Sequence, residues 1–413
     1  MIRVLAVIVA PPHLSVSGAG RAAEQLSRAL AAHCEITVAS MMGPQSTGED
    51  GDLRRVAVSV TLPPGLGSPR VPNRYRTLFY RSDIPDLIRP GAYDIVHIHN
   101  PMPALEMARI ARACRRAGIP YVVSTHGFNE IANGAQAYGL GLLKRLAWQL
   151  LVAQPVRSAV SGADAIFTLS PADDTIVRGM GYAGEALVCV PNGVPAPPAA
   201  DPVGDGEIYR RLRVAERRPG QITCMFLANH TPNKGLPVLL EAFSQLKCPY
   251  QLIVGGEKRP EIDYSAALAR QGEDQRIVVT GRLTDAEVAA LFRRADLFVF
   301  PTLADTFPLS ILEAMSYGVP VLASHVGGIP YQIDGRCGAL VSPGSVGELA
   351  DAVSHFAREP EILAEMGRQA RLRVTAQFTW ESAARRAAAE YERLLRPATA
   401  RAAPPEPALS PQI

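Results

Sequence analysis

Two carboxylates, eight residues apart, flank the most informative segment of this 413-residue chain. Asp305 stands in a polar stretch before Pro308, and Glu313 falls inside an apolar run with helical spacing. Proline suits the first helical turn, because its missing N–H would have no partner there. The free main-chain N–H groups and the positive end of the helix dipole together favour phosphate. The segment therefore predicts an anion site with an acid on each side of it.

A lysine in a second segment points to the same chemistry. Lys234 comes at the end of the run 228–235, which follows an apolar strand pattern and opens a helix. A cation at a helix start, beyond the end of a strand, can neutralise a diphosphate. Glu313 lies too deep in its helix to stabilise the dipole end, so a grip on sugar hydroxyls is the better interpretation.

Strands and helices must position these residues, and both halves of the chain alternate between the two patterns. Such alternation predicts an α/β fold with two Rossmann-like, doubly wound parallel sheets, which would face each other across a cleft. A stretch rich in Pro, Gly and charge separates the halves, as in a linker. We expect a first domain, a linker, a second domain, a last helix and a disordered tail, at 1–195, 196–219, 220–378, 379–396 and 397–413.

Composition narrows the class of protein. Hydrophobic residues make up 47% and charged residues 20%, which is ordinary for a globular protein, and a net charge of +3 gives no reason to expect nucleic acid. Six scattered cysteines predict free thiols in a reducing compartment, hence the cytoplasm. The apolar run after Met1 is only about seven residues long, so we interpret it as a first strand and not as a signal peptide.

The segment from Asp305 to Glu313 resembles the Glu-x7-Glu block of retaining glycosyltransferases with the GT-B fold, in particular glycosyltransferase family 4. The resemblance implies that Glu313 binds the ribose of a nucleotide sugar and that Asp305 contacts the transferred sugar. Asp305 is shorter than the usual Glu by one C–C bond, about 1.5 Å. The main chain between the two acids would hold the diphosphate, through Thr306, Phe307, Pro308, Leu309 and Ser310.

Other positions extend the resemblance. Lys234 matches the lysine of the family's Gly-Arg-x-x-x-x-Lys-Gly block, whereas Asn229 stands where that block has its arginine. His126 ends a strand and would touch the transferred sugar. The remaining donor contacts implied are a glycine loop near the phosphates, with Gly18 and Gly20, and a loop against the base, with Arg282 and Leu283.

A glycine-rich turn follows the Gly-Val-Pro break. Gly327-Gly328-Ile329-Pro330 is similar to a loop of the family, in which an acid comes after the proline. This chain has Tyr331 at that position.

No metal or cofactor is predicted. His97 and His99 share one face of a strand, but no Cys or carboxylate joins them in sequence, as a metal site would need. His99 could also line the acceptor side.

The resemblance makes 1–195 the acceptor-side domain and 220–378 the nucleotide-sugar-binding domain. A basic region marks the first of these two domains. Residues 54–116 hold eleven arginines against four acids, with Leu78, Phe79 and Tyr80 among them. An apolar helix at 140–152 adds Lys144 and Arg145. A peripheral contact with anionic lipid, at the inner face of the membrane and near a lipid-linked acceptor, is one interpretation. Solvated helix faces are the other.

The function implied is metal-independent, retaining transfer of a sugar from a UDP- or GDP-linked donor to a hydroxyl acceptor. The acceptor would be a glycan, a lipid-linked molecule or a small molecule, in polysaccharide, glycan or glycolipid assembly. Three alternatives stay open. They are a nucleotide-sugar epimerase on the same scaffold, a dehydrogenase, and a non-catalytic scaffold or partner subunit, which the altered positions Asn229, Asp305 and Tyr331 favour.

Overall fold

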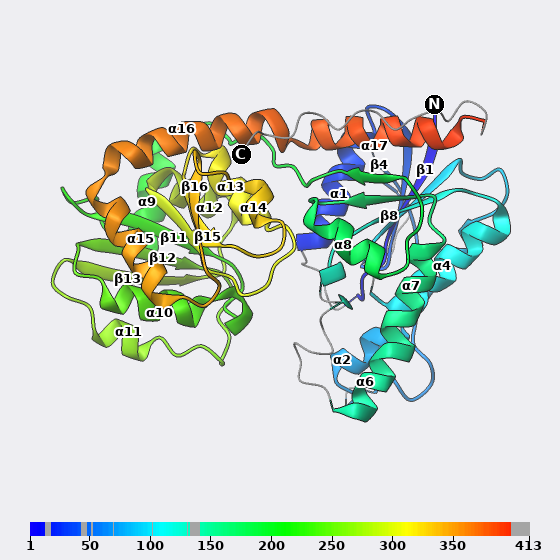
Figure 1. The fold of residues 1–413 in the computed structure, drawn as a ribbon, viewed down its shortest axis with the longest axis horizontal. Coiled ribbons are helices and arrows are strands. Elements are labelled where there is room, and N and C mark those ends of the chain that lie inside the picture. The colour runs from blue at the N-terminus through cyan, green and yellow to red at the C-terminus, as the bar shows by residue number, and fades with distance from the viewer. Residues whose placement is uncertain are drawn as a thin grey trace. The chain divides into compact units, whose positions relative to one another are not determined.

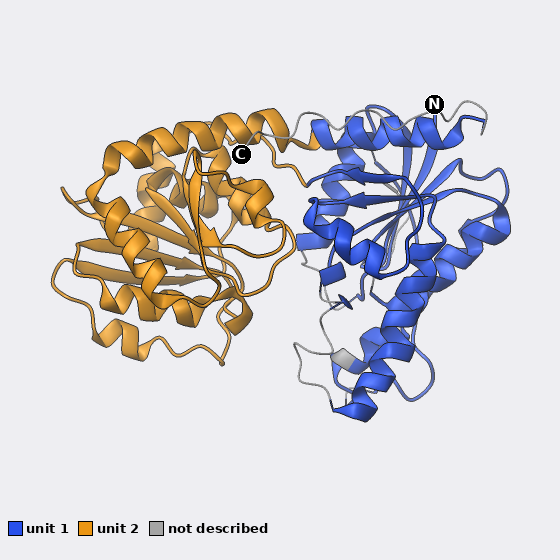
Figure 2. Ribbon diagram, viewed as in Figure 1, with its two compact units in different colours: residues 1–191, 381–413 blue, residues 192–380 orange. Residues whose placement is uncertain are grey.

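The computed structural model describes residues 1–12, 18–42, 48–50, 53–68, 70–100, 102–129, 131–132 and 141–397. The chain divides into two compact units (Figure 2). Unit 1 contains Met1–Pro191 and the C-terminal residues from Glu381, and unit 2 contains Asn192–Trp380. The sequence placed these boundaries at residues 195 and 379.

Unit 1 is built on an eight-stranded sheet in the order β10-β9-β8-β7-β1-β2-β4-β3 (Figure 1). All neighbours are parallel except β3 and β4. Its central strands are continuous apolar runs, because helices cover a parallel sheet on both faces. The strands are β1 (Arg3–Ile8), β2 (Glu35–Ser40), β3 (Gly48–Asp50), β4 (Leu53–Val56), β7 (Ile95–His99), β8 (Tyr121–Ser124), β9 (Ala165–Thr168) and β10 (Leu187–Cys189), with a separate pair, β5 (Val60–Thr61) and β6 (Arg81–Ser82).

The helices of unit 1 follow the strands in alternation. They are α1 (Gly18–Leu30), α2 (Asn73–Arg76), the 3₁₀ turn η1 (Thr77–Phe79), α3 (Ile84–Leu87), α4 (Ala104–Ala117), α6 (Leu142–Trp148), the π-helical η2 (Gln149–Ala153), α7 (Gln154–Ser161) and α8 (Ala172–Gly179). The last helix, α17 (Trp380–Leu395), enters this unit from unit 2. The Tyr391 hydroxyl lies 2.7 Å from His97 Nδ1, so α17 packs against β7.

Unit 2 has a fully parallel six-stranded sheet in the order β13-β12-β11-β14-β15-β16. The strands are β11 (Ile222–Leu227), β12 (Tyr250–Gly255), β13 (Gln275–Gly281), β14 (Leu297–Phe300), β15 (Val321–Ser324) and β16 (Gly338–Val341). The helices are α9 (Pro202–Arg211), the 3₁₀ turn η3 (Pro232–Lys234), α10 (Leu236–Gln245), α11 (Ser265–Ala269), α12 (Asp285–Arg294), α13 (Leu309–Ser316), α14 (Ile329–Gln332), α15 (Val346–Arg358) and α16 (Pro360–Gln377).

The strand order of each sheet reverses at one point, between β1 and β7 in unit 1 and between β11 and β14 in unit 2. At such a switch point the connections leave toward opposite faces of the sheet, and open α/β sheets bind ligands beyond the carboxyl ends of these strands. The loops after β11 and β14 contain Lys234 and Asp305.

The segment expected as a linker, 196–219, is different in the structure. It contains α9, which packs on α12 as part of unit 2. Arg293 pairs with the buried Asp205 at 2.6 Å, and the Tyr209 hydroxyl donates to Ala290 O. Pro202 occupies the first helical position. Ion pairs with the rest of unit 2 are formed by Asp205, Arg211, Arg217 and Arg218. The expected tail, 397–413, lies outside the described residues from 398 onward.

Candidate active site

Two loops of unit 2 are joined at the switch point of its sheet. Leu303 N and Thr302 Oγ1 both donate to Asn233 O, at 2.8 and 3.1 Å. Gly235 has a φ of 74°, and a Cβ there would overlap the Pro301 carbonyl oxygen. Only glycine combines this backbone conformation with such a close approach. The loop after β11 is therefore fixed directly against the loop after β14.

The two loops bring Lys234 and Asp305 together. Lys234 Nζ lies 2.6 Å from Asp305 Oδ2, with the side chains 27% and 15% exposed. The other carboxylate oxygen, Oδ1, accepts from Thr306 N at 3.0 Å. Partial burial strengthens this charge-assisted contact relative to one in open water. An ammonium has three donors, and Asp305 engages one of them, so Lys234 can still bind an anion.

Helix α13 starts later than its sequence suggested. Its first residue is Leu309, and Pro308 is the extended N-cap residue and not part of the first turn. Phe307 precedes this proline, and a residue in that position avoids helical geometry. Its side chain is buried, with the ring 6.0 Å from that of Phe378. The first-turn amides are therefore those from Leu309 and Ser310 onward, and no side chain caps them.

Glu313 lies in the second turn of α13 and is half-buried. It is close enough to Tyr317 to act on it electrostatically. Burial raises the pKa of Tyr317, and the Glu313 charge adds to that rise.

The predicted base loop lies at the ends of β12 and β13. Arg282, which is exposed, pairs with Glu257 Oε2 at 2.8 Å, and this hydrogen bond is the main reason that the Glu257 pKa is lowered. Leu283 is half-buried and packs close to Gly255. Glu257 O in turn accepts from His230 N, so the base loop is connected to the loop that carries Lys234.

Sequence reasoning missed Glu257 and His230. His230 is fully buried, its Nδ1 lies 2.6 Å from the Tyr264 hydroxyl, and burial lowers its pKa. Its place directly after β11 was the available signal. Asn229, beside it, is exposed.

The predicted glycine loop and sugar histidine belong to unit 1. Helix α1 begins at Gly18, so Gly18 and Gly20 stand in its first turn and not in a loop before it. His126 follows β8, and burial lowers its pKa to about 4. The His126 ring lies 6.1 Å from that of His99, which lies 3.8 Å from that of His97.

Buried polar atoms without partners gather at the carboxyl ends of β7 and β9. Among the described residues, both ring nitrogens of His99, Asn100 Oδ1 and Ser170 Oγ have no hydrogen-bond partner. His97, by contrast, contacts Ser124 Oγ and the Tyr391 hydroxyl. Asn100 and Ser170 were not predicted. Asn100 has a φ of 67°, a strained conformation that the sequence does not reveal.

The structure thus brings Lys234, Asp305 and the α13 N-terminus together in unit 2, with Glu313 on the same helix. Gly18, Gly20 and His126 lie in unit 1. Within the described part of the chain, no group of three or more His, Cys, Asp or Glu side chains is arranged to hold a metal ion. No helix there has the length and apolarity needed to cross a bilayer.

Comparisons with known proteins cover both units. A family model described as Glycosyltransferase Family 4 matches residues 16–196. A second model, described as Glycosyl transferases group 1, matches residues 221–359. The second match contains the loops of Lys234 and Asp305, and the first contains His126.

Curated relatives are similar over about three quarters of the chain. An MMP alpha-(1->4)-mannosyltransferase of Mycolicibacterium hassiacum is 26% identical over 318 residues, which are 74% of this chain and 72% of that protein. A D-inositol 3-phosphate glycosyltransferase of Gordonia bronchialis is 28% identical over 329 residues, with coverages of 76% and 68%.

The fold is similar to that of solved structures. Anabaena HepE in complex with UDP has a TM-score of 0.69 at 18% identity, covering 95% of this chain and all of that one. At this level of identity the likeness concerns the fold alone.

Proposed function

This chain belongs to glycosyltransferase family 4, and we propose from that premise that it transfers a sugar from a nucleoside-diphosphate sugar to a hydroxyl acceptor with retention of anomeric configuration. One observation carries the proposal. The Lys234 ammonium lies 2.6 Å from Asp305 at the switch point of unit 2, beside the uncapped start of α13. A cation and free main-chain amides at one helix start suit a pyrophosphate.

Unit 2 would hold the nucleotide of the donor. Lys234 and the amides of Leu309 and Ser310 bind the diphosphate, and Glu313 binds the ribose. Arg282 and Leu283 contact the base. Asp305 orients the transferred sugar, and its bond with Lys234 sets the position of both groups before the donor arrives.

The chemical step needs no side chain as nucleophile. The bond between the anomeric carbon and the diphosphate oxygen breaks, and the acceptor oxygen bonds to that carbon on the same face. The acceptor proton passes to the leaving phosphate oxygen. Negative charge grows on the diphosphate, where Lys234 and the α13 amides stabilise it without a metal. His126 contacts the sugar as a neutral ring, since its pKa is about 4.

The donor would carry UDP or GDP. HepE, whose fold is similar, was solved with UDP. The two curated relatives are named for a mannosyl transfer and for an inositol phosphate acceptor. These names support a sugar-like or phosphorylated polyol acceptor, in glycan, polysaccharide or glycolipid assembly.

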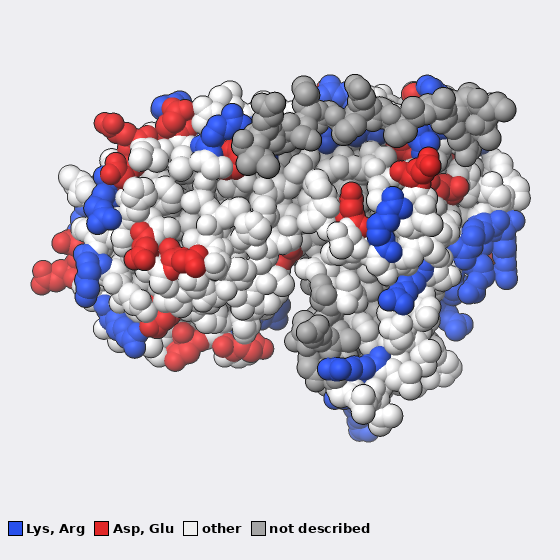
Figure 3. All heavy atoms as spheres, in the orientation of Figure 1, with Lys and Arg blue, Asp and Glu red and all other residues white. Residues whose placement is uncertain are grey.

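Unit 1 would bind the cytoplasmic face of an anionic membrane. Leu142 and Leu143 of α6 are 85% and 84% exposed, next to Lys144 and Arg145. In Figure 3, most of the charged side chains visible on unit 1 are Lys and Arg. A hollow of about 520 Å³ beside α7 is lined by Arg81, Arg109 and Arg112, with Phe79, Tyr80 and Glu106, which pairs with Arg109. Basic and apolar groups together suit an anionic lipid surface.

Flotation tests the membrane contact. The wild type should rise with vesicles of anionic phosphatidylglycerol and not with neutral phosphatidylcholine. Leu143→Ser should reduce flotation, whereas Leu372→Ser, at an exposed leucine of unit 2, should not. Equal flotation of the two variants would remove α6 from the contact.

Turnover tests the transfer itself. Purified protein is incubated with UDP- and GDP-sugars and a panel of polyol, glycan and lipid-linked acceptors. Released nucleoside diphosphate and the anomeric configuration of the product are measured. An α-linked product from an α-linked donor is expected. Inversion would refute retention, and release of an epimer without acceptor would indicate an epimerase. A lack of turnover with every donor would favour the non-catalytic alternative.

A further inference from the structure

The loop that leads into α13 depends on partners outside itself. No side chain caps α13, Pro308 is extended and Phe307 is buried. Its backbone is held by the segment 327–332. Gly328 N donates to Thr306 O at 2.8 Å, and Gln332 Nε2 donates to Pro308 O at 3.0 Å. A Cβ at Gly327 would overlap the Asp305 carbonyl oxygen, so this turn lies directly against the Asp305 backbone.

Segment 327–332 is itself too short to be rigid alone. Helix α14 has four residues, about one turn, and a single turn is unstable without outside contacts. Its last carbonyl groups also have no intrahelical partner. An outside group must therefore fix α14 if α14 is to fix the loop.

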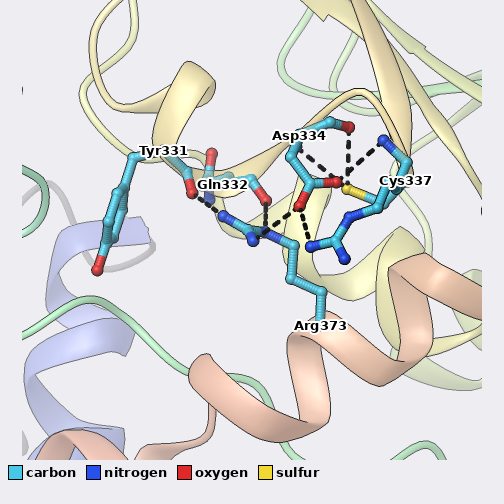
Figure 4. Close-up of polar contacts among 6 residues, drawn as sticks. Tyr331, Gln332, Asp334, Cys337 and Arg373 are labelled. Carbon is cyan, nitrogen blue, oxygen red and sulfur yellow. Dashed lines mark hydrogen bonds and ion pairs between the residues drawn. The ribbon is translucent and has the colours of Figure 1, made fainter. Parts of the chain in front are cut away.

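Arg373, from the distant helix α16, supplies that group (Figure 4). Its Nη2 donates to Tyr331 O at 2.7 Å and its Nε to Gln332 O at 2.9 Å. Its Nη1 lies 3.1 Å from Asp334 Oδ2. The side chain is only 8% exposed, and its guanidinium lies 5.6 Å from the centre of the Phe378 ring. Phe378 also packs against Phe307, so the loop is contacted from a second direction.

The planar fork of arginine is needed for this arrangement. Three N–H groups point to two successive carbonyl oxygens and one carboxylate, a geometry that lysine cannot reproduce. Asp334 is fixed in turn by Arg336, whose Nη2 lies 3.0 Å from the same carboxylate oxygen. Hydrogen bonds to a charged donor are about twice as strong as neutral ones, so the two carbonyl contacts restrain α14 firmly.

We propose that Arg373 and Gln332 are positioning residues for the diphosphate loop, with Arg373 fixing α14 and Gln332 passing that restraint to Pro308. Neither touches the donor. This inference rests on the proposed function, in which the amides after Pro308 bind the diphosphate. Loss of either contact releases the N-terminus of α13, and affinity for the second phosphate falls while the contacts of the base and ribose remain.

The test compares ligands with one and two phosphates. Wild type, Gln332→Met and Arg373→Met are titrated calorimetrically with UDP, UMP, GDP and GMP, and their melting temperatures are measured. Gln332→Met keeps the size of the side chain and removes the Nε2 donor together with Oε1, a buried atom that has no hydrogen-bond partner, so it should fold even if Arg373→Met does not. Arg368→Met is the matched control, because Arg368 lies on the same helix and pairs with Glu365 on its exposed side.

We expect the affinity for the bound nucleoside diphosphate to fall about 10- to 100-fold in both variants, the range that small misplacements of binding groups produce. Affinity for the monophosphate, and both affinities of Arg368→Met, should stay within about twofold. Unchanged diphosphate affinity in a folded Gln332→Met would overturn this inference and leave the proposed function intact. An equal loss of affinity for the diphosphate and the monophosphate would show a merely structural role, which would also overturn the inference. A wild type that binds neither UDP nor GDP would refute the proposed function, and the inference with it.

Discussion

Lys234 Nζ and Asp305 Oδ2 are 2.6 Å apart, although 71 residues separate them in sequence. The sequence suggested two separate roles, a cation for the diphosphate and an acid for the sugar. The contact couples them, because each charge fixes the other at the point where the phosphate and the sugar of the donor would join. Changes at either residue should therefore affect both binding and turnover.

Removal of Lys234 should abolish activity while the fold survives. Lys234→Ala takes away the cation that would meet the departing diphosphate, and losses of about 10²- to 10³-fold in kcat are usual for such groups. Stability should fall by only about 1 kcal/mol, as for a partly exposed ion pair. Steady-state kinetics and thermal melting measure the two effects. Activity near that of the wild type would exclude Lys234 from the mechanism.

Substitution of Asp305 should separate its two contacts. Asp305→Asn keeps the shape and an acceptor for Thr306 N but removes the charge that pairs with Lys234. We expect tighter binding of free UDP or GDP, since Lys234 loses its resting partner, together with a lower kcat. Calorimetry and kinetics on the same preparation check this. Weaker diphosphate binding with unchanged kcat would contradict the coupling.

Glycine at position 235 should be essential for the joined loops. Gly235→Ala places a Cβ on the Pro301 carbonyl at a φ of 74°, and such strain costs about 1–3 kcal/mol. Donor affinity should fall as well, because the loops of Lys234 and Asp305 are forced apart. Gly206→Ala is the control, as it lies within α9 with open space around it and should gain up to about 1 kcal/mol. Urea unfolding compares them, and equal stabilities would refute the steric argument.

Glu313 should discriminate ribose from deoxyribose. If its carboxylate accepts from ribose hydroxyls, Glu313→Gln should weaken UDP or GDP by about 10-fold or more, as expected for a hydrogen bond to a charged group. The same variant should bind the 2′,3′-dideoxy nucleotide as well as wild type does. An equal loss for both nucleotides would place Glu313 elsewhere than at the ribose.

Unit 1 should lose stability in mild acid. Burial lowers the pKa of His97 to about 3 and that of His126 to about 4, against 6.5 for an unfolded histidine. Between pH 6.5 and 4 the unfolded chain therefore binds protons that the native chain does not. The contribution of these histidines to the free energy of unfolding should be fully present above pH 6.5. Below pH 6.5 it should fall by about 1.4 kcal/mol per pH unit for each histidine. Urea unfolding at several pH values measures this slope.

Substitutions assign that slope to particular residues. His126→Phe should make the dependence on pH shallower, because it removes one of the buried rings whose pKa is lowered. A slope that is the same in wild type and His126→Phe would show that His126 does not contribute.

Local signals in the sequence predicted much of the fold. The α/β class and the GT-B fold with its largely parallel sheets are confirmed. Both were predicted from apolar runs and helical periodicity, which are local properties of the sequence. The pattern Thr284-x-x-Glu287 predicts a capping box, and the structure contains it in full at the start of α12. The pattern Ser345-x-x-Glu348 predicts a second box, of which only half forms, since the Glu348 carboxylate accepts from Ser342 N instead. The sequence put Pro308 in the first turn of α13, whereas the structure makes it the extended N-cap residue before Leu309.

Contacts between distant segments were beyond the sequence. Nothing in residues 228–235 or 301–308 indicates that Gly235 touches Pro301 or that Lys234 meets Asp305 before any ligand arrives. Arg373 is likewise one of three arginines along α16, and only the fold brings it to α14, more than 40 residues away. Such pairings depend on tertiary packing, which no periodic pattern encodes.

The route of the chain also has a consequence during protein synthesis. Unit 2 is one continuous stretch, whereas unit 1 needs Tyr391 of α17 to bury His97 and to stack on Phe167. Unit 1, most of which is translated first, therefore cannot complete its core until α17 has been translated. All residues of unit 2 are translated before the last residues of unit 1. Unit 2 is therefore complete first, although its translation starts later.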